Sequence, residues 1–374
     1  MSAQGHSSPG RKEKGPHRSG VRVSLRAFPF FSSPFLLSFF LLLFLFSPPL
    51  PGEAAVFKET RSLLGTMVEI TVVADQEAAA RGGMERAFAE IERIEGLMSF
   101  YRPDSEVSRI NREAFRRPVR VSSEVFRLLQ HAQFLSRLSG GAFDITFSPL
   151  WQLWGQCARQ KRLPTAAELD RAKGLVDYRQ VWLQERGMEV RLGRSGMSVN
   201  LGGIAKGYAL SRAGEMMRRS GLDNFLINLG GDILAAGPGR EGRGWRIGIK
   251  HPRKPGELVG VLRLQDRFSL TSGDYERYFE IGKARFHHII DVRTGYPASR
   301  CAAVTLVTPQ LPLDYLPSVV LFLLGPERAA SLRERFPGVA YLIITPEGRI
   351  FASPDLSSYQ ESPLPARIEM PPSD

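Results

Sequence analysis

Cysteine is scarce in this chain of 374 residues, which has only Cys157 and Cys301. The two lie far apart and form no CxxC pair, which excludes a disulfide framework and a cysteine-rich zinc site. We expect two independent thiols, with a single disulfide between them as the alternative in an oxidising compartment. No cysteine stands at the cleavage point after the apolar N-terminal segment, so a lipoprotein signal is excluded as well.

The glycine-rich segment at residues 199–208 has neither the Walker A nor the GxGxxG spacing, and the sequence lacks a regular alternation of strands and helices. These absences argue against P-loop and Rossmann folds. The formal charge of +12 reflects 50 Lys and Arg against 38 Asp and Glu, but six of those basic residues fall within residues 1–27. No basic stripe with interleaved aromatic residues occurs elsewhere, so we expect no nucleic-acid partner.

Residues 1–55 predict a targeting segment. A basic tail precedes an uncharged apolar run at residues 28–46, and prolines and small residues follow it. This order is typical of a secretory signal. The run has about 19 residues, close to the length that spans a bilayer, so an uncleaved membrane anchor is the alternative. The basic tail predicts in either case that the remainder is exported, to the periplasm or the outer face of the inner membrane.

Residues 56–353 predict an α+β domain, and the Pro- and Ser-rich residues 354–374 predict a loose tail. Apolar residues at helical spacing predict the individual helices, and alternating apolar residues predict the strands. Helices are expected over residues 77–98, 122–138, 205–220, 313–324 and 327–335. Strands are expected over 63–73, 225–229, 233–236, 245–249, 259–264, 268–271, 278–281, 285–290, 304–307 and 339–344, with short strands within 181–199.

A glycine-rich junction at residues 199–208 is the densest chemical signal. Gly202 and Gly203 stand where a strand leads into a helix, and Lys206 follows them. A helix N-terminus offers free N–H groups and a positive dipole end, which suit a phosphate group. The local pattern alone is equally typical of an ordinary glycine-rich helix entry.

Two further groups of polar residues are candidates for chemistry. His287 and His288 precede Asp291 near a strand end, as acid–base groups or metal ligands. Adjacent strand residues face opposite sides, so we expect one histidine to be structural. Asp314 and Ser318 lie four residues apart in a predicted helix and therefore on one face. Their oxygens suit a hard cation such as Mg²⁺, although an acidic helix start beside a solvated serine explains them locally.

Taken in order, these segments resemble the ApbE family of FAD:protein FMN transferases. The resemblance covers about residues 57–353. It rests on Gly-Thr-Met at 65–67, Ser-Phe-Tyr-Arg-Pro-Asp-Ser at 99–105, Gly-Ala-Phe-Asp-Ile-Thr at 141–146, and the segments 200–208, 228–232, 272–277, 288–297 and 314–325.

The resemblance implies two subdomains of a T-fold-like architecture, with FAD in the cleft between them. It implies contacts with the cofactor from Met67 and Tyr101 at the flavin end and from Ala142, Phe143, Asp144, Asn200, Lys206 and Ile289. It further implies Mg²⁺ coordination by the Gly203 carbonyl, Asp314 and Ser318. His288 is expected beside the reacting phosphate as the base, and Asp291 as a residue that could orient it.

The activity implied is Mg²⁺-dependent transfer of FMN from FAD to a Thr or Ser hydroxyl of a partner protein, with release of AMP. The expected partner is an exported FMN-binding protein or an FMN-binding subunit of a membrane redox complex. The acceptor motif itself is absent from this chain, which argues against self-flavinylation.

Several positions depart from the family pattern. Asn200 stands where Asp is usual, Tyr315 where a small residue is usual, and Pro317 lies inside the predicted helix. Ser211, Val292 and Ser318 also differ from the usual residues. These departures keep two alternatives open. One is an FAD pyrophosphatase that yields FMN and AMP, and the other is an exported FAD-binding protein without catalysis.

Overall fold

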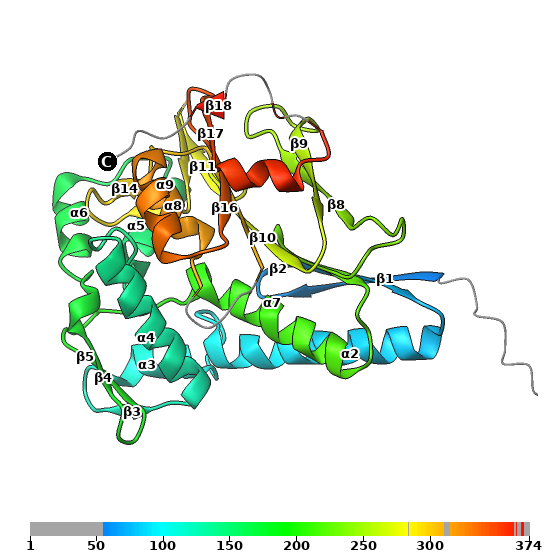
Figure 1. The fold of residues 1–374 in the computed structure, drawn as a ribbon. Helices are drawn as coiled ribbons and strands as arrows, with labels where there is room; N and C mark the ends of the chain where they lie inside the picture. Colours follow the sequence, from blue (N-terminus) through cyan, green and yellow to red (C-terminus); the bar gives the residue numbers. More distant parts are fainter. Residues whose placement is uncertain (1–54, 283, 310–314, 363, 365–367, 370–374) are drawn as a thin grey trace, which may run out of the picture. The chain divides into compact units, whose positions relative to one another are not determined.

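The strand and helix patterns fold into an α+β domain, which confirms the predicted class (Figure 1). The computed structural model describes residues 55–282, 284–309, 315–362, 364 and 368–369. All of them belong to one compact unit, Glu53–Asp374. Residues 1–54, with the predicted targeting segment, lie outside the described residues, so export stays a prediction. Within the described ranges, no helix is both long and apolar enough to cross a membrane.

A mixed sheet forms the centre of the domain. Its strand order is β1-β2-β6-β7-β10-β15-β16-β17-β18, and neighbouring strands are antiparallel except β17 and β18. These strands are β1 (Ala55–Leu63), β2 (Thr66–Ala74), β6 (Phe225–Leu229), β7 (Asp232–Ala236), β10 (Arg267–Gly273), β15 (Ala303–Thr308), β16 (Ala340–Ile344), β17 (Ile350–Ala352) and β18 (Ile368–Glu369).

Helices cover one face of the sheet. The long helix α2 (Glu77–Met98) buries Met84, Phe88 and Ile91 at helical spacing, and these side chains share a core with Val68 and Ile70 of β2. Helix α7 (Gly202–Arg219) lies beside α2, and α8 (Ser318–Leu324) covers β10 and β15 (Figure 1). The remaining helices are α3 (Glu106–Glu113), α4 (Ser123–Leu138), α5 (Ser148–Arg159), α6 (Ala166–Lys173) and α9 (Ala329–Arg335).

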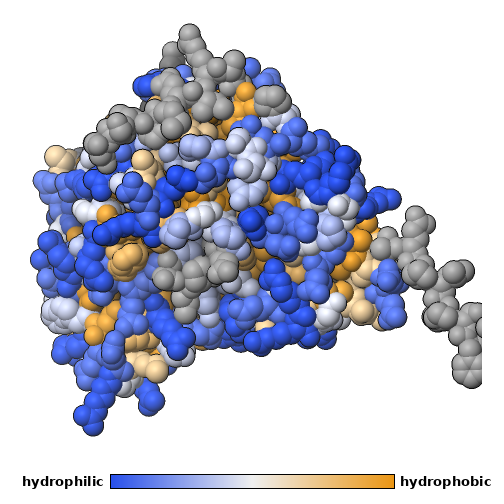
Figure 2. Space-filling view, viewed as in Figure 1, coloured by the Kyte–Doolittle hydropathy of each residue, from blue (hydrophilic) through white to orange (hydrophobic). Residues whose placement is uncertain are grey.

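The other face carries a second apolar layer. Hairpin β8–β9 and the short helix η3 pack Ile247, Leu262 and Leu356 against Val307 and Leu342. On the face seen in Figure 2, apolar side chains form small islands between hydrophilic ones. The further short elements are β3 (Val119–Arg120), β4 (Val181–Gln184), β5 (Glu189–Leu192), β8 (Trp245–Lys250), β9 (Leu258–Leu264), β11 (Tyr278–Ile281), β12 (Ala284–His287), β13 (Ile290–Asp291), β14 (Tyr296–Pro297), η1 (Tyr178–Gln180), η2 (Pro326–Arg328) and η3 (Pro354–Tyr359).

Four expectations about the elements were wrong. The strand expected over 285–290 breaks at residues 288–289, between β12 and β13. The strand expected over 63–73 is interrupted by a two-residue turn, because Leu64 and Gly65 both have positive φ, and it separates β1 from β2. The helix expected over 313–324 starts only at Ser318, since Pro317 has extended backbone angles. Residues 354–359 form η3 rather than a loose tail, because the side chain of Leu356 is fully buried. Helices α3, α5 and α6 were not predicted.

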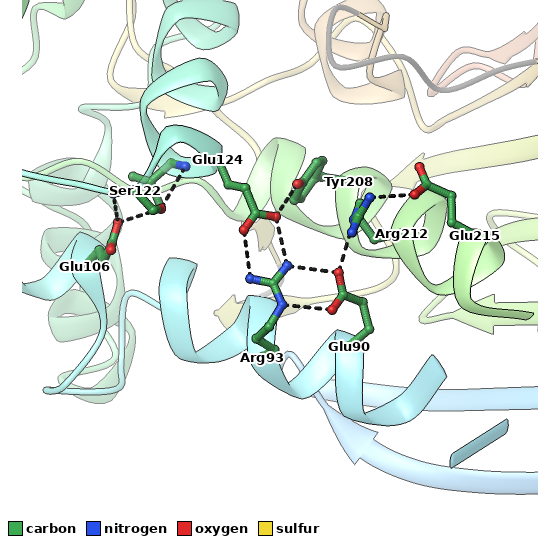
Figure 3. A network of polar contacts seen from close by, with 9 residues as sticks. Glu90, Arg93, Glu106, Ser122, Glu124, Tyr208, Arg212 and Glu215 are labelled. Carbon is green, nitrogen blue, oxygen red and sulfur yellow. Dashed lines mark hydrogen bonds and ion pairs between the residues drawn. The ribbon is translucent and has the colours of Figure 1, made fainter. Parts of the chain in front are cut away.

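A charged network joins three helices on the covered face (Figure 3). Glu124 of α4 accepts two hydrogen bonds from Arg93 of α2, each 2.8 Å long, and another from the hydroxyl of Tyr208 of α7. Arg93 also donates to Glu90, at 2.8 and 2.9 Å, and Glu90 accepts from Arg212 of α7 at 3.1 Å. The network therefore fixes α4, whose C-terminal end leads into residues 140–144, against α2 and α7.

Replacing Glu124 by Gln is expected to lower the free energy of unfolding by about 1–2 kcal/mol, because the half-buried Tyr208 and the guanidinium group of Arg93 lose a charged partner. The hydrogen bond from Arg93 holds the pKa of Glu124, and that of Glu90, below the usual 4.5. The two carboxylates therefore contribute fully to stability above pH 4.5, and this contribution is lost as the pH falls below that value. Urea titrations at pH 7 and pH 4 measure this; Glu92→Gln, at an exposed position of α2, serves as the control. An equal loss at both pH values would contradict the role of the network.

Candidate functional site

The start of α7 is held by the preceding segment. The Asn200 side chain accepts a hydrogen bond from the Gly202 N–H at 2.8 Å, and the backbone N–H of Asn200 donates to the Ile145 carbonyl, also at 2.8 Å. A Cβ atom on Gly203 would lie 3.2 Å from the Phe143 ring and 3.6 Å from Val319. The predicted cofactor segments 142–144 and 200–206 therefore meet at the first turn of α7, beside the start of α8.

Asp144 organises the loop that carries Ala142 and Phe143. Its carboxylate accepts from the Thr146 N–H at 2.8 Å, the Thr146 hydroxyl at 2.7 Å and the Tyr178 N–H at 2.8 Å. Burial raises the pKa of Asp144, and these three donors oppose the rise. Asp144 thus fixes the conformation of the loop, a role in addition to the cofactor contact that the family resemblance implies.

Lys206, the cation expected at the phosphate, is paired. Its Nζ lies 3.0 Å from Oδ2 of the buried Asp232, whose Oδ1 accepts from the Thr271 N–H at 3.1 Å. Asp232 opens β7 directly after the two-residue turn of Gly230 and Gly231, which both have positive φ. The two glycines thus form a tight turn, which places Asp232 where it pairs with Lys206.

His288 is held in one tautomer. Its Nδ1 lies 3.1 Å from the Arg277 carbonyl oxygen, which can only accept, so Nδ1 carries the hydrogen and Nε2 keeps its lone pair. Burial lowers the pKa of His288 to about 4; the bond to the carbonyl opposes this, and the charges of Arg277 and Lys206 add to it. The edge of Trp151 packs against the ring. His288 is therefore neutral at pH 7, with Nε2 as its basic atom.

The two neighbours of His288 in the motif have structural roles. Nε2 of His287 lies 2.7 Å from the Ala298 carbonyl oxygen, and Nδ1 accepts from the Ile289 N–H at 3.2 Å. One histidine is thus structural, as expected from strand alternation. Asp291 forms a bidentate pair with Arg293, at 2.8 and 2.6 Å. The expectation that Asp291 orients His288 was wrong, because a carbonyl takes that place and Asp291 faces Arg293.

The expected metal ligands are described only in part. Asp314 lies outside the described residues. The buried Ser318 hydroxyl lies 2.9 Å from the hydroxyl of Ser272 in β10. Since α8 starts at Ser318, the argument that Asp314 and Ser318 share one helical face does not hold. No group of three or more His, Cys, Asp and Glu that could hold a metal occurs among the residues described. Both cysteines are free and buried, as expected.

Tyr315 fills the space above Gly207. Its hydroxyl donates to the Ile204 carbonyl at 2.9 Å, and a Cβ on Gly207 would lie 2.3 Å from the hydroxyl oxygen. The large residue that departs from the family pattern therefore packs on the first turn of α7 and needs glycine beneath it.

Gly207→Ala is expected to lower the free energy of unfolding by about 1–3 kcal/mol, because the new methyl group overlaps Tyr315. When Tyr315 is also replaced by Ala, Gly207→Ala is expected to leave the free energy of unfolding unchanged or to raise it, since alanine favours the helix. Denaturant titrations of the two single variants and the double variant measure the coupling. Additive effects of the two substitutions would refute the contact.

The expected flavin end lies at the surface. Met67 and Tyr101 are 58% and 73% exposed, so both side chains are open to a ligand. A pocket of about 250 Å³ is lined by Phe100, the residue before Tyr101, and by Asn111 and Ser198, among others. Ile289, in contrast, is buried, and its carbonyl accepts from the Ala298 N–H at 2.9 Å. Its side chain therefore lies in the core beneath the site.

Sequence reasoning assigned no role to Asp232, Ser272 or Arg277. The signal for Arg277 was present in the hairpin pattern, because two strands separated by a short glycine-containing turn pair in a fixed register. Tyr278 pairs with His287, so Arg277 falls opposite His288.

Comparisons with known proteins identify relatives of this chain. The sequence model described as the ApbE family matches residues 64–343. A FAD:protein FMN transferase of Klebsiella pneumoniae is 34% identical over 81% of this chain and 94% of its own. One from Treponema pallidum is 32% identical over 81% of this chain and 88% of its own.

Solved structures show the same likeness. The ApbE protein of Thermotoga maritima has a TM-score of 0.74 and 31% identity, over 82% of this chain and all of its own. The flavin transferase ApbE of Vibrio cholerae has a TM-score of 0.71 and 27% identity, over 82% of this chain and 99% of its own. The ordered motifs, the matching family model and the shared fold show that this chain belongs to the ApbE family.

Proposed function

We propose that this protein is an exported FAD:protein FMN transferase, which moves the FMN phosphoryl group of FAD to a Thr or Ser hydroxyl of a partner protein and releases AMP. The observation that carries the proposal is a neutral histidine, His288, whose basic Nε2 is left open beside Lys206 and Arg277. The names of the relatives describe the same overall reaction.

The chemistry needs a base and positive charge in one place. Nε2 of His288 takes the proton of the acceptor hydroxyl, whose oxygen bonds to the FMN phosphorus. The bond from that phosphorus to the bridging oxygen breaks, and AMP leaves with the electron pair. Because the transferred group carries negative charge through the transition state, cations around it lower the barrier.

Oxygen donors at the start of α8 fit a magnesium ion. The buried Ser318 hydroxyl and the Gly203 carbonyl belong to adjoining first turns, since a Cβ on Gly203 would lie 3.6 Å from Val319. Hard oxygen ligands are those Mg²⁺ prefers, and Asp314 would add a carboxylate. When bound there, Mg²⁺ supplies charge neutralisation for the pyrophosphate.

The partner proposed is an exported FMN-binding protein or an FMN-binding subunit of a membrane redox complex. The apolar run at residues 28–46 supports export and membrane association. The open Met67 and Tyr101 leave the flavin end accessible from outside.

The test uses the full-length protein in mild detergent with FAD, Mg²⁺ and a recombinant FMN-binding domain that carries a Thr-containing acceptor motif. A fluorescent flavin band on the acceptor after denaturing electrophoresis, lost with EDTA, is the expected result. AMP release without a band would favour the pyrophosphatase. Retained FAD with neither product would favour a binding protein without catalysis.

A further inference from the structure

Arg277 lies at the meeting point of three segments. Its carbonyl accepts from the backbone N–H of His288 and faces Nδ1 of the same residue, both at 3.1 Å. The antiparallel pairing of β11 with β12 sets this position, because Tyr278 is opposite His287. The backbone of Arg277 is therefore fixed beside the proposed base.

The side chain of Arg277 reaches the tip of the β1–β2 hairpin, which in turn touches the tip of a second hairpin. Its Nη2 donates to the Gly65 carbonyl at 2.8 Å, in the turn before Met67. The Met67 carbonyl accepts from the Gly230 N–H at 3.1 Å, and a Cβ on Gly230 would lie 2.4 Å from the Thr66 hydroxyl. The β1–β2 and β6–β7 tips thus touch each other, and Asp232 with its partner Lys206 directly follows the second tip.

The cations around this place differ in their partners. Lys206 lies 3.0 Å from Asp232, and Arg253 pairs with Asp274 at 2.7 Å, so a carboxylate offsets each charge. Arg277 has no carboxylate within 4.0 Å among the residues that the structure describes. A guanidinium group carries five N–H donors, and the bond to Gly65 uses one of them. The guanidinium group of Arg277 therefore keeps free N–H donors and has no carboxylate partner among the described residues, and it is close enough to His288 for its charge to lower the pKa of that histidine.

We propose that Arg277 binds the non-bridging oxygens of the FMN phosphoryl group while it moves from FAD to the acceptor hydroxyl. The inference rests on the proposed function and assigns one of its substrate contacts. A guanidinium fork matches two phosphate oxygens, and its anchor on the Gly65 carbonyl preorganises it. The same anchor couples the phosphate contact to the turn that presents Met67.

The experiment compares flavins with and without phosphate. Quenching of flavin fluorescence measures the affinity of the full-length protein for FAD and for riboflavin, and single-turnover flavinylation measures the transfer rate. Arg277→Gln is expected to weaken FAD binding and slow transfer roughly 10- to 100-fold, with riboflavin binding unchanged. Arg277→Lys keeps the charge without the fork and is expected to recover part of the loss.

Arg285→Gln is the matched control, because Arg285 lies on the same hairpin and its guanidinium group stacks on the Tyr278 ring, 4.0 Å from its centroid. It should leave both measurements unchanged. If Arg277→Gln weakens FAD and riboflavin equally, Arg277 only positions the turn, and the phosphate contact is refuted. Unchanged FAD binding and transfer in Arg277→Gln would also refute it. If the native protein neither binds FAD nor transfers FMN, the proposed function fails and the inference fails with it.

Discussion

Replacing His288 by Asn is expected to lower the flavinylation rate about 100- to 10,000-fold, the usual contribution of a positioned general base. The asparagine amide can still donate to the Arg277 carbonyl, as Nδ1 does, but nothing replaces the basic Nε2. Affinity for FAD is therefore expected to stay close to that of the native protein. Single-turnover transfer to the acceptor domain, together with FAD titration, separates the two effects.

The pH profile provides the control for this assignment. Since burial lowers the pKa of His288 to about 4, Nε2 stays unprotonated and the native rate is expected to stay level from pH 8 to about pH 5.5 and to fall below that. His251→Asn, on the β8–β9 hairpin, should reproduce this profile. A native profile with its midpoint near 6.5 would show a solvated ring and contradict the geometry. Full activity of His288→Asn would place the base elsewhere.

Replacing Asp144 by Ala is expected to lower the free energy of unfolding by about 2–4 kcal/mol, because three donors in a buried loop lose their acceptor at once. The loop carries Phe143, which packs on Gly203 at the start of α7, so affinity for FAD should fall with stability. Urea titration and FAD titration of the same samples measure both losses.

Asp144→Asn supplies the graded comparison. The amide oxygen can still accept from Thr146, whereas the amide nitrogen meets the Tyr178 N–H, so an intermediate loss of stability is expected. If the alanine variant is as stable as the native protein, the loop does not depend on Asp144. If the alanine variant is stable and loses only its affinity for FAD, Asp144 would instead be a direct ligand of the cofactor.

Much of the fold follows from local pattern. Helix α2 runs over Glu77–Met98 as predicted, because its apolar side chains recur at helical spacing over six turns and nothing interrupts them. Helix α4 begins after Ser122, whose hydroxyl accepts from the Val125 N–H. Where backbone torsions decide, the hydropathy pattern failed. The turn at Leu64–Gly65 divides a predicted strand, and the extended Pro317 delays the start of a predicted helix.

The sequence by itself determined the family, the α+β class and the glycine-rich start of α7. It also predicted that one of His287 and His288 is structural, since each of these features depends on residue order and local periodicity. Only the tertiary structure decided which charges meet. Lys206 and Asp232 come from different elements, Asp291 turned to Arg293, and Arg277 joined His288 to the turn before Met67. These pairings depend on contacts between segments distant in the chain, which strand register and helix packing fix and local sequence does not.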